Sequence, residues 1–234
     1  MSLVFEERSS DSPYIDTITW GRTTADGGTI RPAEAHWHMV LVRWQGEQKL
    51  LVVGPWTTAG EVSWLAGAEI LWLRFSLGTY MPHLPTRNLR DAETPLPDAS
   101  SRSFWLKGSA WQFPQAGQVE IFIECLVREA VLARDPVVAA ALQDRLNGTP
   151  PRTIRHHFLH TTGLSFNQIT QLERAQHAAA LITDGVSILD TVYEAGYFDQ
   201  PHLTRALKRF IGYTPAYLAR TAQVAQAPES SRAA

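Results

Sequence analysis

Hydrophobic residues in the first half of the chain come in short runs separated by turn residues, a pattern typical of β-strands. The runs are Ile15–Trp20, Trp37–Trp44, Leu50–Val53, Val62–Leu65 and Ile70–Leu77. Pairs such as Gln45-Gly46 and Ala66-Gly67 lie between them. Several short strands at this spacing favour an antiparallel sandwich or a small barrel. Residues 81–103 contain four prolines, so we expect a long irregular connection there.

From residue 118 onward the hydrophobic period becomes helical. Val119, Phe122, Ile123 and Leu126 follow i, i+3, i+4 spacing, which predicts a helix over 118–134. This helix either supports dimerisation or packs on its own barrel or on the next domain. A second helix is predicted to start at Asp135-Pro136, because proline suits a first helical turn, and to end near Asn147-Gly148.

A third helix is predicted after Thr149-Pro150-Pro151, with the Thr149 hydroxyl as its cap. Its inward residues are Ile154 and Phe158, and its outward residues are Arg152, Arg155 and His156. Gly163 is expected to end it. Ser165-Phe166-Asn167-Gln168 then reads as a capping box that opens a linker helix reaching Asp184-Gly185. The predicted buried stripe of that linker helix is Phe166, Ile169, Leu172, Ala179 and Ile182.

The same arrangement is predicted a second time further along the chain. Ile188, Val192 and Ala195 form a short helical stripe, and Gly196 suits the left-handed residue that ends a helix. After a tight turn, Asp199 is expected to cap a helix whose inward residues are Leu203, Leu207 and Phe210. A helix, a tight turn and a helix with outward polar residues make a helix-turn-helix motif.

These residues resemble the AraC/XylS family of transcription regulators. Residues 188–199 and 203–210, followed by Gly212-Tyr213-Thr214-Pro215, are similar to the family's second helix-turn-helix, and residues 154–163 are similar to its first. Arg174 and Ala178 fit the pattern of the helix between them. The sequence departs from the family at Pro150, where a capping residue such as serine is usual, at His156, where arginine is frequent, and at Pro201.

The resemblance implies an α+β multidomain fold. Residues 1–115 are expected to form a cupin-like β-barrel or sandwich that acts as a sensor, and 116–135 an interdomain helix. Residues 136–221 are expected to form an all-α domain with two helix-turn-helix motifs joined by a linker helix. Residues 222–234 are rich in Ala, Ser, Gln and Pro and are expected to be disordered.

Double-stranded DNA is the partner that the resemblance implies. Arginine and glutamine can each pair with a base edge in the major groove, which favours Arg152, Arg155, Arg205 and Gln200 as base readers. Lys208 and Arg209 are expected to contact phosphates. The candidate DNA-binding residues are Arg152, Arg155, His156, Gln200, His202, Thr204, Arg205, Lys208 and Arg209. A linker helix of about 19 residues spans roughly 28 Å, close to the ~34 Å of one DNA turn.

Charge is divided unevenly along the chain, whose net charge is −2. Residues 1–136 carry 12 Lys and Arg against 16 Asp and Glu, whereas residues 137–220 carry 8 against 6. Phosphate attraction is therefore expected to be modest and base contacts more important. With one cysteine, Cys125, no long apolar run and no recognisable secretory signal, we expect a cytoplasmic protein without disulfides or membrane contact.

The pair His36 and His38 suggests an alternative, a metal-dependent cupin enzyme. Leu41 and Val42 stand where that pattern needs a glutamate, so we expect hydrogen-bonded histidines, no metal, no cofactor and no enzymatic activity. All eight tryptophans lie before residue 112. They suit either a small apolar or aromatic effector or an ordinary core. A homodimer is expected, and RNA polymerase is a further candidate partner.

Overall fold

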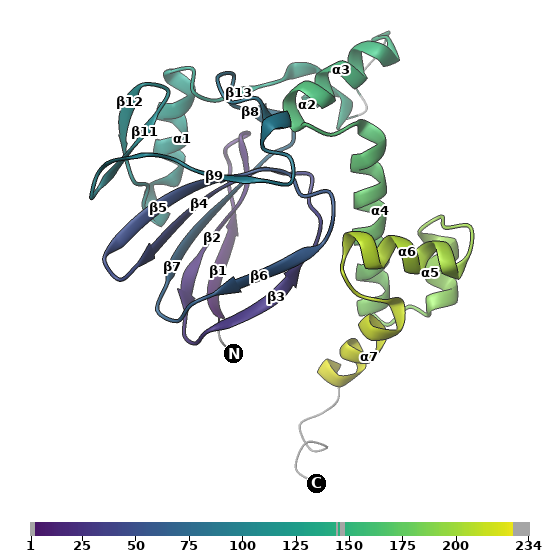
Figure 1. Ribbon diagram of the computed structural model, residues 1–234. Coiled ribbons are helices and arrows are strands. Elements are labelled where there is room, and N and C mark those ends of the chain that lie inside the picture. Colours follow the sequence, from purple (N-terminus) through teal and green to yellow (C-terminus); the bar gives the residue numbers. More distant parts are fainter. Residues whose placement is uncertain (1–2, 144, 146–147, 227–234) are drawn as a thin grey trace. The chain divides into compact units, whose positions relative to one another are not determined.

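The computed structural model describes residues 3–143, 145 and 148–226 (Figure 1). By its contacts the chain divides into two compact units. The first contains the described residues of Met1–Thr29, Glu34–Trp56 and Ser63–Phe166. The second contains Ile30–Ala33, Thr57–Val62 and the described residues of Asn167–Ala234. The domain boundaries predicted at residues 115, 135 and 221 stay a prediction.

The largest sheet has six antiparallel strands. In spatial order they are β1 (Leu3–Ser9), β2 (Ile15–Thr23), β7 (Glu69–Phe75), β4 (His38–Trp44), β5 (Glu47–Val53) and β9 (Glu93–Pro95). The predicted fold class, a sheet-rich half followed by helices, is confirmed. Within the described ranges the sheet is open, because β1 and β9 form its two edges and do not pair with each other. Of the two predicted alternatives, a barrel or a sandwich, the described residues form no closed barrel.

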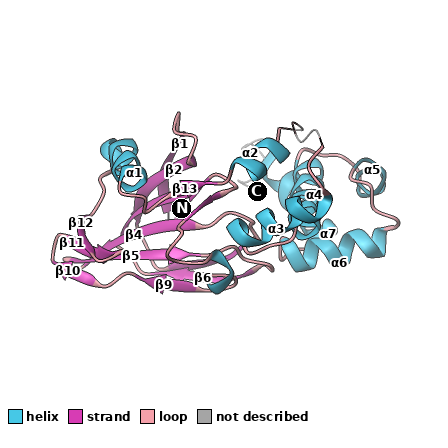
Figure 2. Cartoon of the chain, turned by 90° about the horizontal axis from the view of Figure 1, so that it is seen from above, coloured by secondary structure: helices cyan, strands magenta, loops and turns pink. Residues whose placement is uncertain are grey.

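Among the residues that the structure describes, the sheet-rich half also contains three smaller sheets and two short 3₁₀ helices (Figure 2). The sheets are β3 (Gly27–Arg31) with β6 (Gly60–Trp64), β10 (Asp98–Ser100) with β11 (Ser103–Leu106) and β12 (Ser109–Gln112), and β8 (Thr79–Tyr80) with β13 (Ala133–Arg134). The 3₁₀ helices are η1 (Thr86–Asn88) and η2 (Ala116–Gln118). All five predicted strand runs lie on strands, whereas β1, β3 and β8 to β13 have no counterpart in the prediction. Of these, β9 and β10 lie within residues 81–103, where an irregular connection was expected.

One face of the six-stranded sheet is buried. Ile18, Leu73, Met39 and Val52 are paired across neighbouring strands and point to this face, because side chains alternate along a strand. They pack in one core with Val119, Ile123 and Leu126 of α1 (Val119–Arg128) and with Phe104 of β11. The helix predicted over 118–134 is therefore shorter and packs on its own sheet. It ends at Arg128 because residues 133–134 pair with β8 instead.

The remaining helices are α2 (Pro136–Ala141), α3 (Pro151–Thr162), α4 (Phe166–Thr183), α5 (Ile188–Glu194), α6 (Gln200–Phe210) and α7 (Pro215–Gln226). The predicted end of α2 near Asn147-Gly148 was too late, and Asn147 lies outside the described residues. Residues 222–226, predicted to be disordered, continue α7, since Ala222 is buried. The rest of that predicted tail, 227–234, lies outside the described residues. No described helix is long and apolar enough to span a membrane.

Candidate nucleic-acid interface

The motif formed by α5 and α6 is built as its sequence predicts. The Ser187 hydroxyl accepts a hydrogen bond from the Asp190 N–H and begins α5. Gly196 has a φ of 67° and turns the chain after α5. Asp199 Oδ1 then accepts a hydrogen bond from the His202 N–H at 2.7 Å, so Asp199 caps α6. These local contacts fix where α6 begins.

The inward face of α6 anchors it in a small core. Leu203, Leu207 and Phe210 are buried. Leu203 and Leu207 pack with Val192 of α5 and with Ile182 of α4. This stripe uses i, i+4, i+7 spacing, so the remaining positions of α6 face away from the core.

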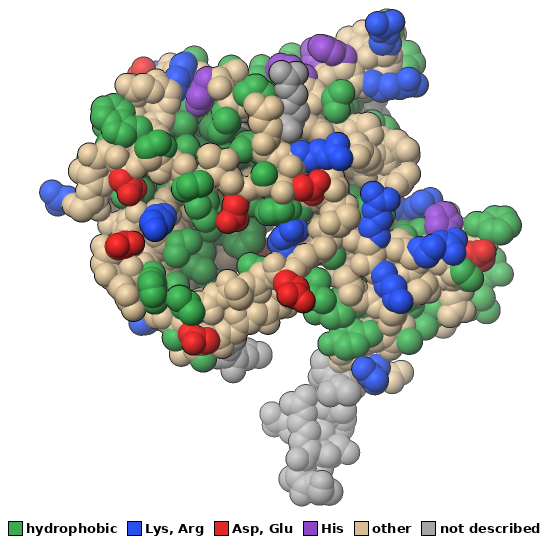
Figure 3. All heavy atoms as spheres, viewed as in Figure 1, with side chains coloured by type: hydrophobic (Ala, Val, Ile, Leu, Met, Phe, Trp, Pro, Cys, Tyr) green, Lys and Arg blue, Asp and Glu red, His purple; other side chains and the backbone are tan. Residues whose placement is uncertain are grey.

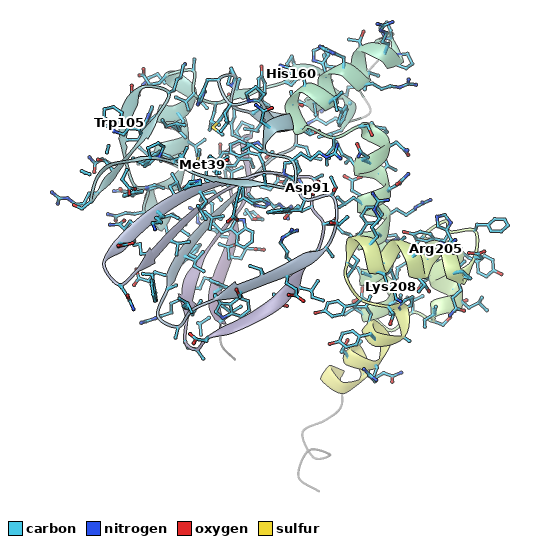
Figure 4. The ribbon with its side chains drawn as sticks, in the orientation of Figure 1. Met39, Asp91, Trp105, His160, Arg205 and Lys208 are labelled. Atoms are coloured by element: carbon cyan, nitrogen blue, oxygen red, sulfur yellow. The ribbon has the colours of Figure 1, made fainter. Side chains whose placement is uncertain are left out.

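The outward face of α6 carries most of the predicted DNA-binding residues of this motif. Gln200, Arg205, Lys208 and Arg209 are exposed, and Arg205 and Lys208 project from this one helix (Figure 4). Thr204 and His202 are half-buried, and the His202 ring packs edge-to-face on Tyr197 with centroids 5.1 Å apart. The face therefore presents one amide and three cationic side chains, which are the groups that read base edges and bind phosphates.

A residue of the linker helix holds the turn between α5 and α6. The Arg174 guanidinium lies over the Tyr197 ring, 4.5 Å from its centroid, and its Nη1 donates a hydrogen bond to the Gly196 carbonyl at 3.4 Å. Tyr197 itself is buried. Stacking of this kind stabilises by about 0.5–2 kcal/mol. Arg174 therefore fixes the turn that leads into α6.

The buried stripe of the linker helix α4 contains three of the five residues predicted for it, Ile169, Leu172 and Ile182. Its buried residues are Ile169, Leu172, Ala175, Ala178 and Ile182. Phe166 is 48% exposed and Ala179 half-buried, so both expectations were wrong. Ala175, which was not predicted to be buried, packs with Ala33 and Phe210, two residues far from it in sequence. At 18 residues, α4 is about 27 Å long.

The first motif, formed by α2 and α3, begins differently from the prediction. Pro150 takes the cap position of α3 and makes no side-chain hydrogen bond, so Thr149 is not the cap. Pro151 at the first helical position offsets the missing cap, because the φ of proline already suits a helix. Gly163, with a φ of 72°, ends α3 as predicted. Arg152, Arg155 and His156 are all exposed on α3, over which arginine and histidine side chains gather in Figure 3.

Contacts with the sheet-rich part of the first unit hold α3 in place. The Thr86 hydroxyl on η1 donates to the carbonyls of His160 and Thr161, at 3.0 and 2.8 Å. Asp135 caps α2 through Oδ1 and bonds the His157 ring through Oδ2 at 2.7 Å. Thr86 was not among the predicted site residues, because no local signal marks a residue 75 positions away from its partner Thr161.

His36 and His38 belong to a network of charged side chains in the first unit. His36 Nε2 lies 3.1 Å from Asp16 Oδ2, and His38 Nε2 lies 3.0 Å from Glu34 Oε2. Arg74 approaches both carboxylates, at 3.5 and 3.6 Å. His38 Nδ1 accepts a hydrogen bond from the Trp72 indole. Among the described residues, no three His, Cys, Asp or Glu side chains are arranged to hold a metal ion.

Opposing effects shift the pKa values of this network. Burial raises the pKa of Asp16, but hydrogen bonds from His36 and Ser76 and attraction to Arg74 outweigh it and lower that pKa to about 2. Burial likewise raises the pKa of Glu34, and its bonds with His36 and His38 lower it well below its usual range. Burial lowers the pKa of His36, but its bonds to Asp16 and Glu34 raise it overall. The network therefore favours charged carboxylates and a charged His36.

A cavity of about 340 Å³ lies in the first unit against the six-stranded sheet. Trp20, Leu41 and Leu71 supply much of its apolar wall, with Arg43 and Glu69 among its polar groups. Arg43 is braced by Gln48, which accepts from its Nε at 2.9 Å. The cavity is also lined by Val4, Glu6, Gly21, Arg22, Ile70, Pro114 and Ala116. Its volume and mostly apolar lining suit a small organic molecule.

Comparisons with known proteins agree with the helical motifs. A family model described as "Helix-turn-helix domain" matches residues 145–221. The "HTH-type transcriptional regulator RipA" of Corynebacterium glutamicum is 32% identical over 87 residues, which are 36% of this chain and only 26% of that protein. The chain therefore matches about a quarter of that relative's length.

Solved structures of ToxT from Vibrio cholerae O395 align more broadly but more weakly. One covers 93% of this chain and 97% of ToxT at 9% identity, with a TM-score of 0.39. Another, ToxT bound to (E)-4-(8-methylnaphthalen-1-yl)but-3-enoic acid, gives 10% identity and a TM-score of 0.38 over 93% of this chain and 98% of ToxT. TM-scores below 0.5 do not establish a common fold.

Proposed function

We propose that residues 145–221, which match the helix-turn-helix family model, form an AraC-type DNA-binding domain and that the chain is a sequence-specific DNA-binding transcription regulator. The observation that carries the proposal is the outward face of α6. There Gln200 and Arg205 are exposed while Leu203, Leu207 and Phe210 are buried behind them. The major groove of DNA is wide enough for one helix. A helix that is packed on one face can read base edges there with the polar side chains of its other face.

The proposal includes two recognition helices, α3 and α6, that enter successive major grooves. The exposed Arg152 and Arg155 support this role for α3. An α4 length of about 27 Å is compatible with one DNA turn of ~34 Å. On α6, Arg205 is proposed to read guanine and Gln200 adenine, while Lys208 and Arg209 contact phosphates. His156, His202 and Thr204 complete the proposed contact set.

We further propose that a small apolar or aromatic effector controls DNA binding from the sheet-rich half. The apolar cavity beside Trp20 supports this, and the protein is proposed not to be an enzyme. A ligand regulates only if it binds two states of the protein with different affinity. The cupin-like fold, the homodimer, the contact with RNA polymerase and the cytoplasmic location stay predictions.

Selection of bound sites from random duplex DNA by the full chain tests this function. We expect one enriched site with two half-sites about one helical turn apart. Enrichment of no sequence above background would contradict the proposed DNA binding. Enrichment of a single half-site would contradict the proposal that α3 and α6 both read DNA. Metal analysis of the same protein tests the alternative enzyme, which needs stoichiometric metal bound through His36 and His38.

A further inference from the structure

Two segments from the sheet-rich half of the sequence hold the C-terminal end of α6. The Ala33 N–H donates to the Phe210 carbonyl at 2.6 Å, and the Ala59 N–H donates to the Arg209 carbonyl at 2.8 Å. The last four carbonyls of a helix have no partner inside the helix. Residues 30–33 and 57–62, which we call the clasp, therefore satisfy two of these groups on α6.

Apolar packing closes around the same contact. Ala33 is fully buried and packs with Leu172 and Ala175 of α4 and with Phe210. The side-chain amide of Gln176, also on α4, donates to the Ala33 carbonyl at 3.1 Å. The clasp thus joins the linker helix to the recognition helix, and Ala33 uses both its backbone groups to do so.

A glycine after α6 is fitted to the clasp. Gly212 has a φ of +88°, and a β-carbon built on it would lie 2.4 Å from Cγ2 of Ile30. Atoms this close must move apart, so a side chain at 212 would displace either the clasp or the end of α6. Gly185 has a similar φ of +95°, but no atom lies within 4 Å of the corresponding position. It is a matched control for backbone strain alone.

The residues that adjoin the two segments of the clasp are paired with each other. The Glu34 N–H donates to the Trp56 carbonyl and the Trp56 N–H donates to the Glu34 carbonyl, both at 2.9 Å. Glu34 follows the first segment directly, and Trp56 precedes the second. The Glu34 carboxylate is held in turn by His38 and Arg74. Glu34 and Trp56, which adjoin the clasp in sequence, are therefore themselves fixed within the first unit.

We infer that the clasp positions α6 for base reading, so that residues from the sheet-rich half contribute to the affinity of the second motif for DNA. This inference rests on the proposed DNA-binding function. Hydrogen bonds to base edges weaken steeply when distance or angle departs from the optimum. A recognition helix fixed at both ends, by Asp199 and by the clasp, holds Arg205 in one register.

The test compares full-length variants on two DNA probes. The first is the duplex selected by the wild-type chain, and the second is that duplex with the half-site sensitive to Arg205→Ala scrambled. Gly212→Ala is expected to bind the first probe about tenfold more weakly, a common size of coupling between sites. It is expected to bind the scrambled probe as the wild type does. Gly185→Ala should match the wild type on both probes.

Rescue separates positioning from general damage. Ile30→Ala removes the atom that a side chain at 212 would meet, so the double variant should recover most of the lost affinity. Gln176→Ala, which removes one hydrogen bond at an exposed position, should show a smaller loss confined to the same half-site.

Three results would overturn the inference. These are normal binding by Gly212→Ala, an equal loss on both probes, and failure of Ile30→Ala to restore binding. If the wild-type chain selects no duplex at all, the proposed function is wrong and this inference falls with it. If the wild-type chain selects a duplex that Gly212→Ala binds normally, only the inference is wrong.

Discussion

The Thr86 hydroxyl donates a hydrogen bond to the carbonyl of Thr161, at the last turn of α3. Thr86 is buried on η1, so its hydroxyl has no access to water as a substitute partner. The contact places the end of a candidate recognition helix against the sheet-rich part of the same unit. The position of α3 therefore depends on residues outside the motif to which it belongs.

Thr86→Val keeps the shape of the side chain but removes this donor. We expect it to lower the free energy of unfolding by about 1–2 kcal/mol, because the carbonyls of His160 and of the buried Thr161 lose a partner. Thr86→Ser retains the hydroxyl and should lose less. Urea unfolding followed by tryptophan fluorescence measures this, since all eight tryptophans lie before residue 112. No loss in Thr86→Val, together with a loss in Thr86→Ser, would show that the methyl group, not the hydrogen bond, matters.

Arg205 and Lys208 on α6 are expected to differ in their effect on DNA binding. Arg205→Ala should lose about 1–3 kcal/mol on the selected duplex and relax the preference at one base pair, because a bidentate base contact is lost. Lys208→Ala should weaken all duplexes about equally and reduce the salt slope by about 1. Titrations at several salt concentrations measure both. The same pattern in both variants would contradict the division into base reader and phosphate contact.

The cavity beside Trp20 is expected to bind small apolar molecules. Fluorescence titration of the full chain with indole, benzyl alcohol and 1-octanol should show saturable binding of at least one. Ala116→Leu places a larger side chain in the lining and should weaken that binding at least about tenfold, or ~1.4 kcal/mol. Ala110→Leu, at an exposed position of β12, is the control. Unchanged binding by Ala116→Leu would place the ligand elsewhere.

Stability should depend on pH through the network of Asp16, Glu34 and His36. The two carboxylates have lowered pKa values, so their contribution is present above about pH 4.5 and is lost as the pH falls, for Asp16 through about 2. His36 has a raised pKa, so its contribution is present below about pH 6.5 and is lost as the pH rises through its folded pKa. The network should therefore stabilise most between about pH 4.5 and 6.5.

Asp16→Asn isolates this effect, because asparagine resembles the protonated aspartic acid. The difference in free energy of unfolding from the wild type should be about 1–2 kcal/mol near pH 5.5. It should shrink both near pH 2 and near pH 9. Urea unfolding at the three pH values measures it. A difference that does not change with pH would show that the charges of this network add no net stability.

Local chemistry let the sequence predict the second motif almost residue by residue. Asp199 caps α6 because its carboxylate accepts a hydrogen bond from a backbone N–H in the first turn of that helix. Gly196 adopts a left-handed conformation at the turn after α5, where glycine is favoured. The inward stripe of Leu203, Leu207 and Phe210 follows from helical periodicity alone. The five predicted strand runs were found for the same reason, since short apolar runs and the turns between them are short-range features.

Only the tertiary structure shows where the helix after residue 118 ends and which residues hold the ends of α3 and α6. The helix after residue 118 ends at Arg128 because residues 133–134 pair with β8, a contact between segments more than 50 residues apart. The ends of α3 and α6 are satisfied by Thr86 and by Ala33 and Ala59, whose side chains or positions carry no signal of that role. A sequence thus determines where a helix begins through local capping. What holds the far end of that helix is set by chain segments that only folding brings together.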